Sequence, residues 1–158
     1  MVKKLISDRR FCSGCLACVV NCSQFHEGHA APSSSRIQID LDPFTGDYIS
    51  LYCTQCEEKV CVDQCPSGAI EEDAAGNTKI NYDVCIGCQA CIAACPHGAV
   101  FYDSVTDKVI KCDACSGDPQ CAKACYTGAL LWIEPEEADS FEKEKMVSRY
   151  FCRKEPRS

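Results

Sequence analysis

Residues 85–96 read Cys85-Ile-Gly-Cys88-Gln-Ala-Cys91-Ile-Ala-Ala-Cys95-Pro96, with two, two and three residues between successive cysteines. This C-x2-C-x2-C-x3-C-P run is typical of iron–sulfur proteins, and in two-cluster proteins its fourth cysteine binds the other cluster of the pair. Cysteines at every third residue let a loop wrap one face of an iron–sulfur cube, so the fourth ligand must come from elsewhere. The run therefore predicts 4Fe-4S clusters and predicts that Cys95 serves a neighbouring cube.

The remaining cysteines repeat this pattern along the chain. There are 17 cysteines in 158 residues, far above ordinary usage. Sixteen of them form four quartets that all end in an x3-Cys step: Cys12, Cys15, Cys18 and Cys22; Cys53, Cys56, Cys61 and Cys65; Cys85, Cys88, Cys91 and Cys95; and Cys112, Cys115, Cys121 and Cys125. The last cysteine, Cys152, stands alone and is expected to be a free thiol. Because so short a chain has little apolar surface left for a core, we expect bound metal to hold the fold.

A repeated phrase indicates how the quartets pair. Cys65-Pro-Ser-Gly-Ala-Ile, Cys95-Pro-His-Gly-Ala-Val and Cys125-Tyr-Thr-Gly-Ala-Leu each predict a glycine turn leading into a strand, and short hairpins follow the first two. Quartets two and three thus form one compact two-cluster unit, which leaves quartets one and four to pair. The alternative, one with two and three with four, is disfavoured because it would break this unit. The expected ligand sets are Cys12, Cys15, Cys18 and Cys125; Cys53, Cys56, Cys61 and Cys95; Cys85, Cys88, Cys91 and Cys65; and Cys112, Cys115, Cys121 and Cys22.

The expected fold class is α+β, with tandem ferredoxin-like two-cluster modules made of short helices, β-hairpins and irregular loops. Residues 1–22 and 96–133 would form an outer module and residues 53–95 an inner one. Residues 23–52 are interpreted as an inserted β-hairpin, because an alternating segment, a turn and a second strand follow one another there. Residues 134–158 form a tail with a predicted docking helix, whose apolar stripe is Met146, Val147, Tyr150 and Phe151. Packing of this helix on its own domain is an equally good interpretation.

Charge and hydropathy limit the classes of partner. The chain has 16 Lys and Arg against 23 Asp and Glu, a net charge of −7, which argues against binding nucleic-acid phosphates. No apolar run approaches the length of a membrane span, and only Leu5-Ile6 is apolar before Ser7, so no secretory signal is expected. We therefore expect a cytoplasmic location with protein partners. Disulfides are rare in that compartment, which favours metal over disulfides.

Zinc is the alternative metal. A four-thiolate zinc site usually takes one C-x2-C pair from each of two segments, and three cysteines in strict succession would leave one without a role. A zinc-stapled interaction module nevertheless remains the alternative from another functional class. The sequence contains no nucleotide fingerprint, Walker motif or H-E-x-x-H, so no catalytic residue is expected. His26 and His29 are expected in a loop after Cys22 and His97 in a turn, at the surface or beside clusters rather than as ligands.

Three stretches carry a resemblance to a known family: Phe11-Cys-Ser-Gly-Cys; Cys22-Ser-Gln-Phe-His-Glu-Gly with Pro32-Ser-Ser-Ser-Arg-Ile; and Lys111-Cys-Asp-Ala-Cys-Ser-Gly-Asp-Pro-Gln-Cys. Over roughly residues 9 to 133 the chain resembles the four-cluster polyferredoxin subunits of molybdenum and tungsten oxidoreductases. Gly117-Asp118-Pro119 makes it most similar to the ferredoxin-like subunits of tungsten aldehyde oxidoreductases. Tyr126, where the family usually has proline, and Lys59-Val60, in place of a common proline, depart from the pattern and weaken the choice of subfamily.

This resemblance implies the quartet pairing given above and the same sixteen ligands. It also implies a large catalytic subunit with pterin-bound tungsten or molybdenum, and often a flavin subunit that handles NAD(P). The expected function is therefore electron transfer through four 4Fe-4S clusters, without catalysis by this chain. A carbon monoxide dehydrogenase, hydrogenase or formate dehydrogenase is the alternative catalytic partner. A linear arrangement of clusters has two ends, which would also allow end-to-end association with copies of the chain.

Overall fold

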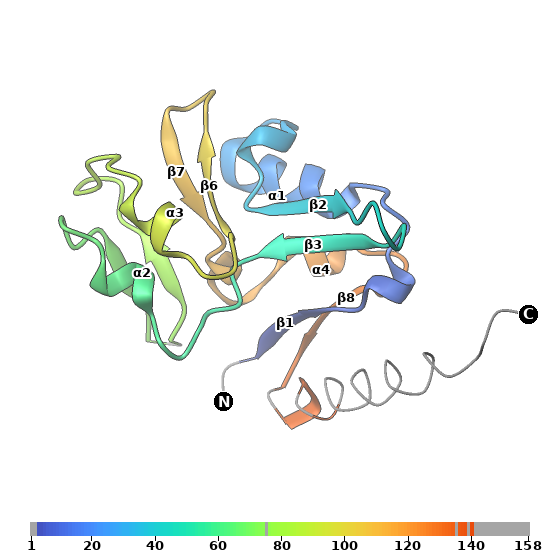
Figure 1. Cartoon of the computed structure of the whole chain (residues 1–158). Coiled ribbons are helices and arrows are strands. Elements are labelled where there is room, and N and C mark those ends of the chain that lie inside the picture. The colour runs from blue at the N-terminus through green and yellow to red at the C-terminus, as the bar shows by residue number, and fades with distance from the viewer. Residues whose placement is uncertain (1–2, 75, 135, 139, 141–158) are drawn as a thin grey trace, which may run out of the picture.

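The structure is a computed structural model that describes residues 3–74, 76–134, 136–138 and 140. Within these residues, short helices alternate with pairs of strands (Figure 1). In chain order the elements are β1 (Lys4–Ser7), η1 (Arg9–Phe11), α1 (Ala17–Glu27), η2 (Pro32–Ser34), β2 (Ile37–Leu41), β3 (Tyr48–Tyr52), α2 (Val60–Asp63), β4 (Ile70–Glu72), β5 (Thr78–Ile80), α3 (Ala90–Ala94), β6 (Val100–Asp103), β7 (Lys108–Lys111), η3 (Ala114–Gly117), α4 (Gln120–Lys123) and β8 (Leu130–Ile133). The predicted mixture of short helices and small antiparallel sheets is thus confirmed.

The strands form two-stranded antiparallel sheets. Three of these sheets are hairpins between neighbours in the chain: β2–β3, β4–β5 and β6–β7. The fourth pairs β1 with β8, so that Lys4 lies opposite Ile133 and Ser7 opposite Leu130. This last sheet brings the two ends of the described chain side by side (Figure 1).

Aspartate residues organise the three hairpin turns. The Asp42 carboxylate accepts a hydrogen bond from the Phe44 backbone N–H at 2.9 Å. Asp73 accepts one from the Asn77 N–H at 2.9 Å, and the buried Asp103 accepts from the Val105 N–H at 2.9 Å. Such side-chain bonds to following backbone groups fix tight turns. They set the lengths of the hairpins and hence the positions of the cysteine runs that lie between them.

The helices pack in two pairs. α1 contacts α4, and α2 contacts α3 (Figure 1). The first turn of α1 contains Cys18, and the helix ends at Glu27 because Gly28, with φ +74°, caps it in the left-handed conformation. α1 is therefore a true helix of 11 residues where the sequence predicted a short turn and a loop.

Each helix pair has its own small core, and cysteines form part of both. The buried cluster near α1 and α4 contains Val19, Ile37, Tyr52 and Leu130 together with Cys18, Cys22 and Cys121. The cluster near α2 and α3 contains Ile70, Val100 and Val109 together with Cys91. Within the described residues, no helix has the length and apolar character needed to cross a lipid bilayer. The predicted helical stripe from Met146 to Phe151, and Cys152, lie outside the described residues.

Candidate metal centres

The first and third cysteine runs form loops with the same backbone. Gly14 and Gly87 both have φ +67°, and the residues two positions later, Leu16 and Gln89, have φ 59° and 61°. Alternating left- and right-handed residues direct successive backbone N–H groups to one side and create a concavity that suits an anion. Non-glycine residues adopt this conformation at an energetic cost, and such outliers cluster at functional sites.

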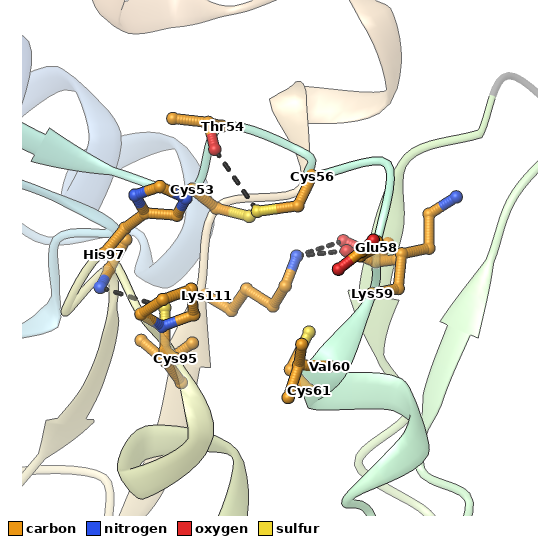
Figure 2. A pocket seen from close by; sticks show the side chains of 14 residues that line it. Cys53, Thr54, Cys56, Glu58, Lys59, Val60, Cys61, Cys95, His97 and Lys111 are labelled. Carbon is orange, nitrogen blue, oxygen red and sulfur yellow. Dashed lines mark hydrogen bonds between the residues drawn. The ribbon is translucent and has the colours of Figure 1, made fainter.

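Four cysteines from two separate runs line a single pocket. Cys53, Cys56 and Cys61 come from the loop before α2 and its first turn, and Cys95 comes from the end of α3. Figure 2 shows these side chains around a common space, with His97 and Lys111 beside them. We call this group site 2.

A second pocket repeats the arrangement. Cys12, Cys15 and Cys18 line it from one loop, and Cys125 joins them from the segment after α4. Tyr126, which stands where Pro66 and Pro96 stand in the other repeats, places its hydroxyl 3.1 Å from the Ser13 Oγ. The tyrosine thus ties the fourth run to the first, which gives this departure from the family pattern a structural role. We call this group site 1.

The other two groups are identified by the charges that act between their thiols. Burial raises the pKa of Cys91, and the neighbouring charges of Cys65 and Cys85 contribute to the rise. We call these three cysteines, together with Cys88 of the same loop, site 3. Burial likewise raises the pKa of Cys121, and Cys112, Cys22 and Cys115 add to the rise. These four form site 4. In the pockets of sites 1 and 2, three cysteines of one run meet the last cysteine of another run.

The chemistry of these thiols fits the cationic core of an iron–sulfur cluster. Burial raises the pKa of Cys18 and of Cys115 to about 11 and that of Cys112 to about 12. Thiols with such pKa values keep their protons near neutral pH. A bound metal cation displaces these protons, because it binds the deprotonated thiolate. Iron–sulfur clusters are bound by sets of four cysteine sulfurs. The sulfurs here are partly desolvated and close enough to interact electrostatically. The residues present therefore fit 4Fe-4S groups.

The fourth cysteine of the second, third and fourth runs receives hydrogen bonds from the turn that follows it. The backbone N–H groups of Ala69, Ala99 and Leu130 donate to the Sγ atoms of Cys65, Cys95 and Cys125 at 3.3, 3.4 and 3.3 Å. Burial raises the pKa of Cys65 and of Cys125, but hydrogen bonds from Ser67, Thr127 and these backbone groups outweigh it and lower the pKa of both. Hydrogen bonds of this kind stabilise thiolates and tune cluster potentials.

His26 lies in the last turn of α1 and not in the predicted loop. Its side chain is only 9% exposed, and its Nε2 lies 3.6 Å from the Cys115 Sγ and 3.5 Å from the Asp113 Oδ1. Burial lowers the pKa of His26, and the charge of Arg36 lowers it further while that of Asp113 opposes them. The ring therefore sits beside a site 4 sulfur. His29 and His97 are exposed, as expected.

Sequence reasoning missed two residues at the sites. Lys111 is 3% exposed, lines the site 2 pocket and precedes the site 4 residue Cys112. Gln55, with φ 52°, donates from its Nε2 to the Cys112 backbone oxygen at 2.9 Å and so connects the site 2 loop to site 4. No signal in the sequence separates this lysine from the surface lysines; only the packing of β7 reveals it.

The chain is similar to known ferredoxin-like proteins. A ferredoxin-like protein of Escherichia coli (strain K12), YdhY, is 35% identical over 101 residues, which cover 54% of this chain and 49% of YdhY. The polyferredoxin-like subunit of the aliphatic sulfonate oxidoreductase of Pyrococcus furiosus is 40% identical over 80 residues, 50% of this chain and 46% of that subunit. The chain thus spans about half the length of the curated relatives it matches.

Similarity to a solved structure extends over more of the chain. A chain of the active site complex BamBC of benzoyl coenzyme A reductase superposes with a TM-score of 0.50 and 27% identity, covering 94% of this chain and 91% of that one. The model of the 4Fe-4S dicluster domain matches residues 44–134. The chain therefore belongs to the 4Fe-4S dicluster domain family.

Proposed function

We propose that the chain is an electron-transfer subunit of an oxidoreductase complex and that it holds four 4Fe-4S clusters. The observation that carries this proposal is the convergence of cysteines from separate runs on shared pockets, three from one run and one from another. Site 1 would be ligated by Cys12, Cys15, Cys18 and Cys125; site 2 by Cys53, Cys56, Cys61 and Cys95; site 3 by Cys85, Cys88, Cys91 and Cys65; and site 4 by Cys112, Cys115, Cys121 and Cys22. Such clusters supply one-electron transfer when bound.

Contacts between neighbouring groups of cysteines support an arrangement of the four proposed sites in a row, as a relay requires. Cys61 and Cys95 of site 2 pack on the same core as Cys91 and Cys65 of site 3. Gln55, in the site 2 loop, donates to the backbone oxygen of Cys112 at 2.9 Å, which supports a position of site 4 beside site 2. The site 4 residues Cys22 and Cys121 share a core with Cys18 of site 1. The order is therefore site 3, site 2, site 4 and site 1.

The two end sites each carry an exposed cysteine, Cys88 in site 3 and Cys15 in site 1. Exposed ends are what a relay needs, because electrons must enter at one site and leave at another. We propose a division into an inner module of residues 53–95 and an outer module of residues 1–22 and 96–133, with residues 23–52 inserted; the pairing of β1 with β8 supports the outer module. End-to-end association of copies stays a prediction, and a strictly monomeric native mass would exclude it.

For the catalytic partner we propose a large subunit with a tungsten- or molybdenum-pterin centre of the aldehyde oxidoreductase type, with a flavin subunit for NAD(P) as the further acceptor. The likeness to a chain of a benzoyl coenzyme A reductase active site complex and to the sulfonate oxidoreductase subunit supports a catalytic partner of this general kind. A carbon monoxide dehydrogenase, hydrogenase or formate dehydrogenase would be served by the same relay.

Metal analysis of the anaerobically purified chain tests the cluster proposal. We expect about sixteen irons and sixteen sulfides per chain, four of each per cube, and an electron paramagnetic resonance (EPR) signal after dithionite reduction. Zinc without sulfide would establish the alternative of a zinc-stapled interaction module and end the proposal. A pull-down from the native host, with tungsten, molybdenum and flavin analysis of the captured subunits, tests the proposed partner.

A further inference from the structure

Lys111 is a buried cation that lacks a carboxylate partner. It ends strand β7 and is 3% exposed. Its Nζ donates to the Thr78 backbone oxygen at 3.0 Å, to the Thr78 Oγ1, and to the Cys112 backbone oxygen at 3.3 Å. All three acceptors are neutral. Among the residues that the structure describes, no Asp or Glu forms an ion pair with this ammonium group.

An isolated charge in such a position is costly. Burying an ammonium group without a counter-ion loses hydration that neutral acceptors only partly replace, so buried charges are normally paired. We therefore look for the counter-ion of Lys111 in the pocket that this side chain lines. That pocket is site 2, because Lys111 lines it together with Cys53, Cys56, Cys61 and Cys95 (Figure 2).

A hydrogen-bond network holds the ammonium group in place. The Oε1 of Gln55 accepts from both the N–H and the Oγ1 of Thr78 at 2.8 Å. Because the Thr78 hydroxyl gives its hydrogen to Gln55, its lone pairs remain for Lys111. The Nε2 of Gln55 donates to the same Cys112 oxygen that Lys111 uses. The cation is thus fixed by its surroundings and cannot swing out to solvent.

Two other cations near the sites, Lys59 and Arg36, are paired with carboxylates. Lys59 also lines the site 2 pocket, but its Nζ lies 2.7 Å from the Glu72 Oε1. The guanidinium of Arg36, near site 4, pairs with Asp113 at 3.0 Å. Lys111 therefore stands apart from both as a fixed, uncompensated positive charge.

We propose that Lys111 is the buried counter-ion of the cluster at site 2 and raises its reduction potential. This inference rests on the proposed function, since it needs an anionic iron–sulfur group at that site. A fixed positive charge stabilises an added electron, and nearby charge and burial set cluster potentials. Site 2 lies inside the proposed row. Lys111 would therefore give one of the inner clusters a higher reduction potential, so that this cluster holds an electron more strongly.

Redox titration followed by EPR tests this with Lys111→Gln, which removes the charge but keeps an amide donor. We expect the reduction equilibrium of one cluster to fall at least tenfold, which for one electron is about 59 mV. Site 4, whose Cys112 touches the same ammonium group through its backbone oxygen, should shift less. Sites 1 and 3 should keep their potentials. Lys111→Arg, which retains the charge, should stay close to the wild-type chain.

Lys59→Gln is the matched control, because it removes a cation that lines the same pocket but is neutralised by Glu72. We expect a much smaller shift from it. Selective loss of the site 2 cluster in Lys111→Gln, with retention in Lys111→Arg, would also support a counter-ion role. Four clusters with unchanged potentials in Lys111→Gln would overturn the inference, as would equal damage in Lys111→Gln and Lys111→Arg. Absence of iron from the wild-type chain would instead overturn the proposed function.

Discussion

Cys95 lies in one cysteine run but lines the pocket of another, and this separation leads to a sharp prediction. Replacing it by serine should damage the cluster at site 2 and spare that at site 3, although three cysteines of its own run belong to site 3. We expect the iron content to fall by about a quarter, one cube in four. Iron analysis with EPR measures this, and Cys152→Ser, outside the quartets, is the control. Loss of the site 3 signal instead would reverse the proposed pairing.

Gly14 and Gly87 occupy equivalent positions with φ +67°, but their surroundings differ. A Cβ on Gly14 would lie 2.3 Å from the Tyr48 ring, whereas nothing lies within 4 Å of a Cβ on Gly87. Gly87→Ala should therefore cost only the left-handed strain of about 1–2 kcal/mol, and Gly14→Ala clearly more. Thermal unfolding under anaerobic conditions compares them. Adding Tyr48→Ala should restore part of the loss in Gly14→Ala, and equal losses in the two single variants would contradict the explanation.

At individual positions, the sequence predicts the cysteine groups better than their surroundings. Spacing within a run reflects how a short loop wraps one cube, so Cys85, Cys88 and Cys91 could be grouped from the sequence. Lys111 could not be found in this way, because its burial depends on how β7 packs beside Thr78 at the start of β5. The His26 contact with Cys115 was missed for a similar reason, although Gly28 is a recognisable helix stop that could have indicated a longer α1.

Strand β1 closes the outer part of the molecule through its pairing with β8, and the Asp8 N–H continues the contact with the Ala129 oxygen at 2.8 Å. Ile6, in this strand, is 7% exposed. Ile6→Ala should destabilise the fold by about 2–5 kcal/mol and release iron from sites 1 and 4 before sites 2 and 3. Urea unfolding followed by iron release measures both effects. Val105→Ala, at a 66% exposed turn position, should change stability by about 0.5 kcal/mol or less. Uniform release from all four sites would contradict the assigned role of β1.

The hairpins were predictable as elements, whereas the β1–β8 sheet was not. Alternating residues on either side of an Asp-rich turn indicate β2 and β3 locally, and the repeated Gly-Ala phrase indicates the strands after Cys65 and Cys95. β1 has only Leu5 and Ile6 as a signal, and its partner lies at the opposite end of the described chain. Pairing at such a separation is decided by the tertiary structure, which brings site 1 and site 4 together, and not by local preference.

Across the whole molecule, the cluster sites occupy the places where a larger protein would have a core. Three of the seven buried residues in the core near α1 and α4 are cysteines. The aliphatic side chains that are almost fully inaccessible in the described residues, Val19, Ile37, Val109 and Ile110, are too few to offset the conformational entropy of so long a chain. Clusters that bind only the folded chain add their binding free energy to its stability.

Removal of iron should therefore unfold the chain and not merely inactivate it. Without iron, the thiols of each site lose their shared ligand, and those raised in pKa by burial would be left as protonated groups around an open space. We expect anaerobic chelation to abolish most far-ultraviolet circular dichroism and to expand the hydrodynamic radius, and iron with sulfide to restore both. Chelation in the presence of excess zinc distinguishes iron from zinc as the metal that holds the fold, because we expect that zinc will not restore the native circular dichroism spectrum. An iron-free chain that keeps its compact radius and native spectrum would show that the protein part alone holds the fold.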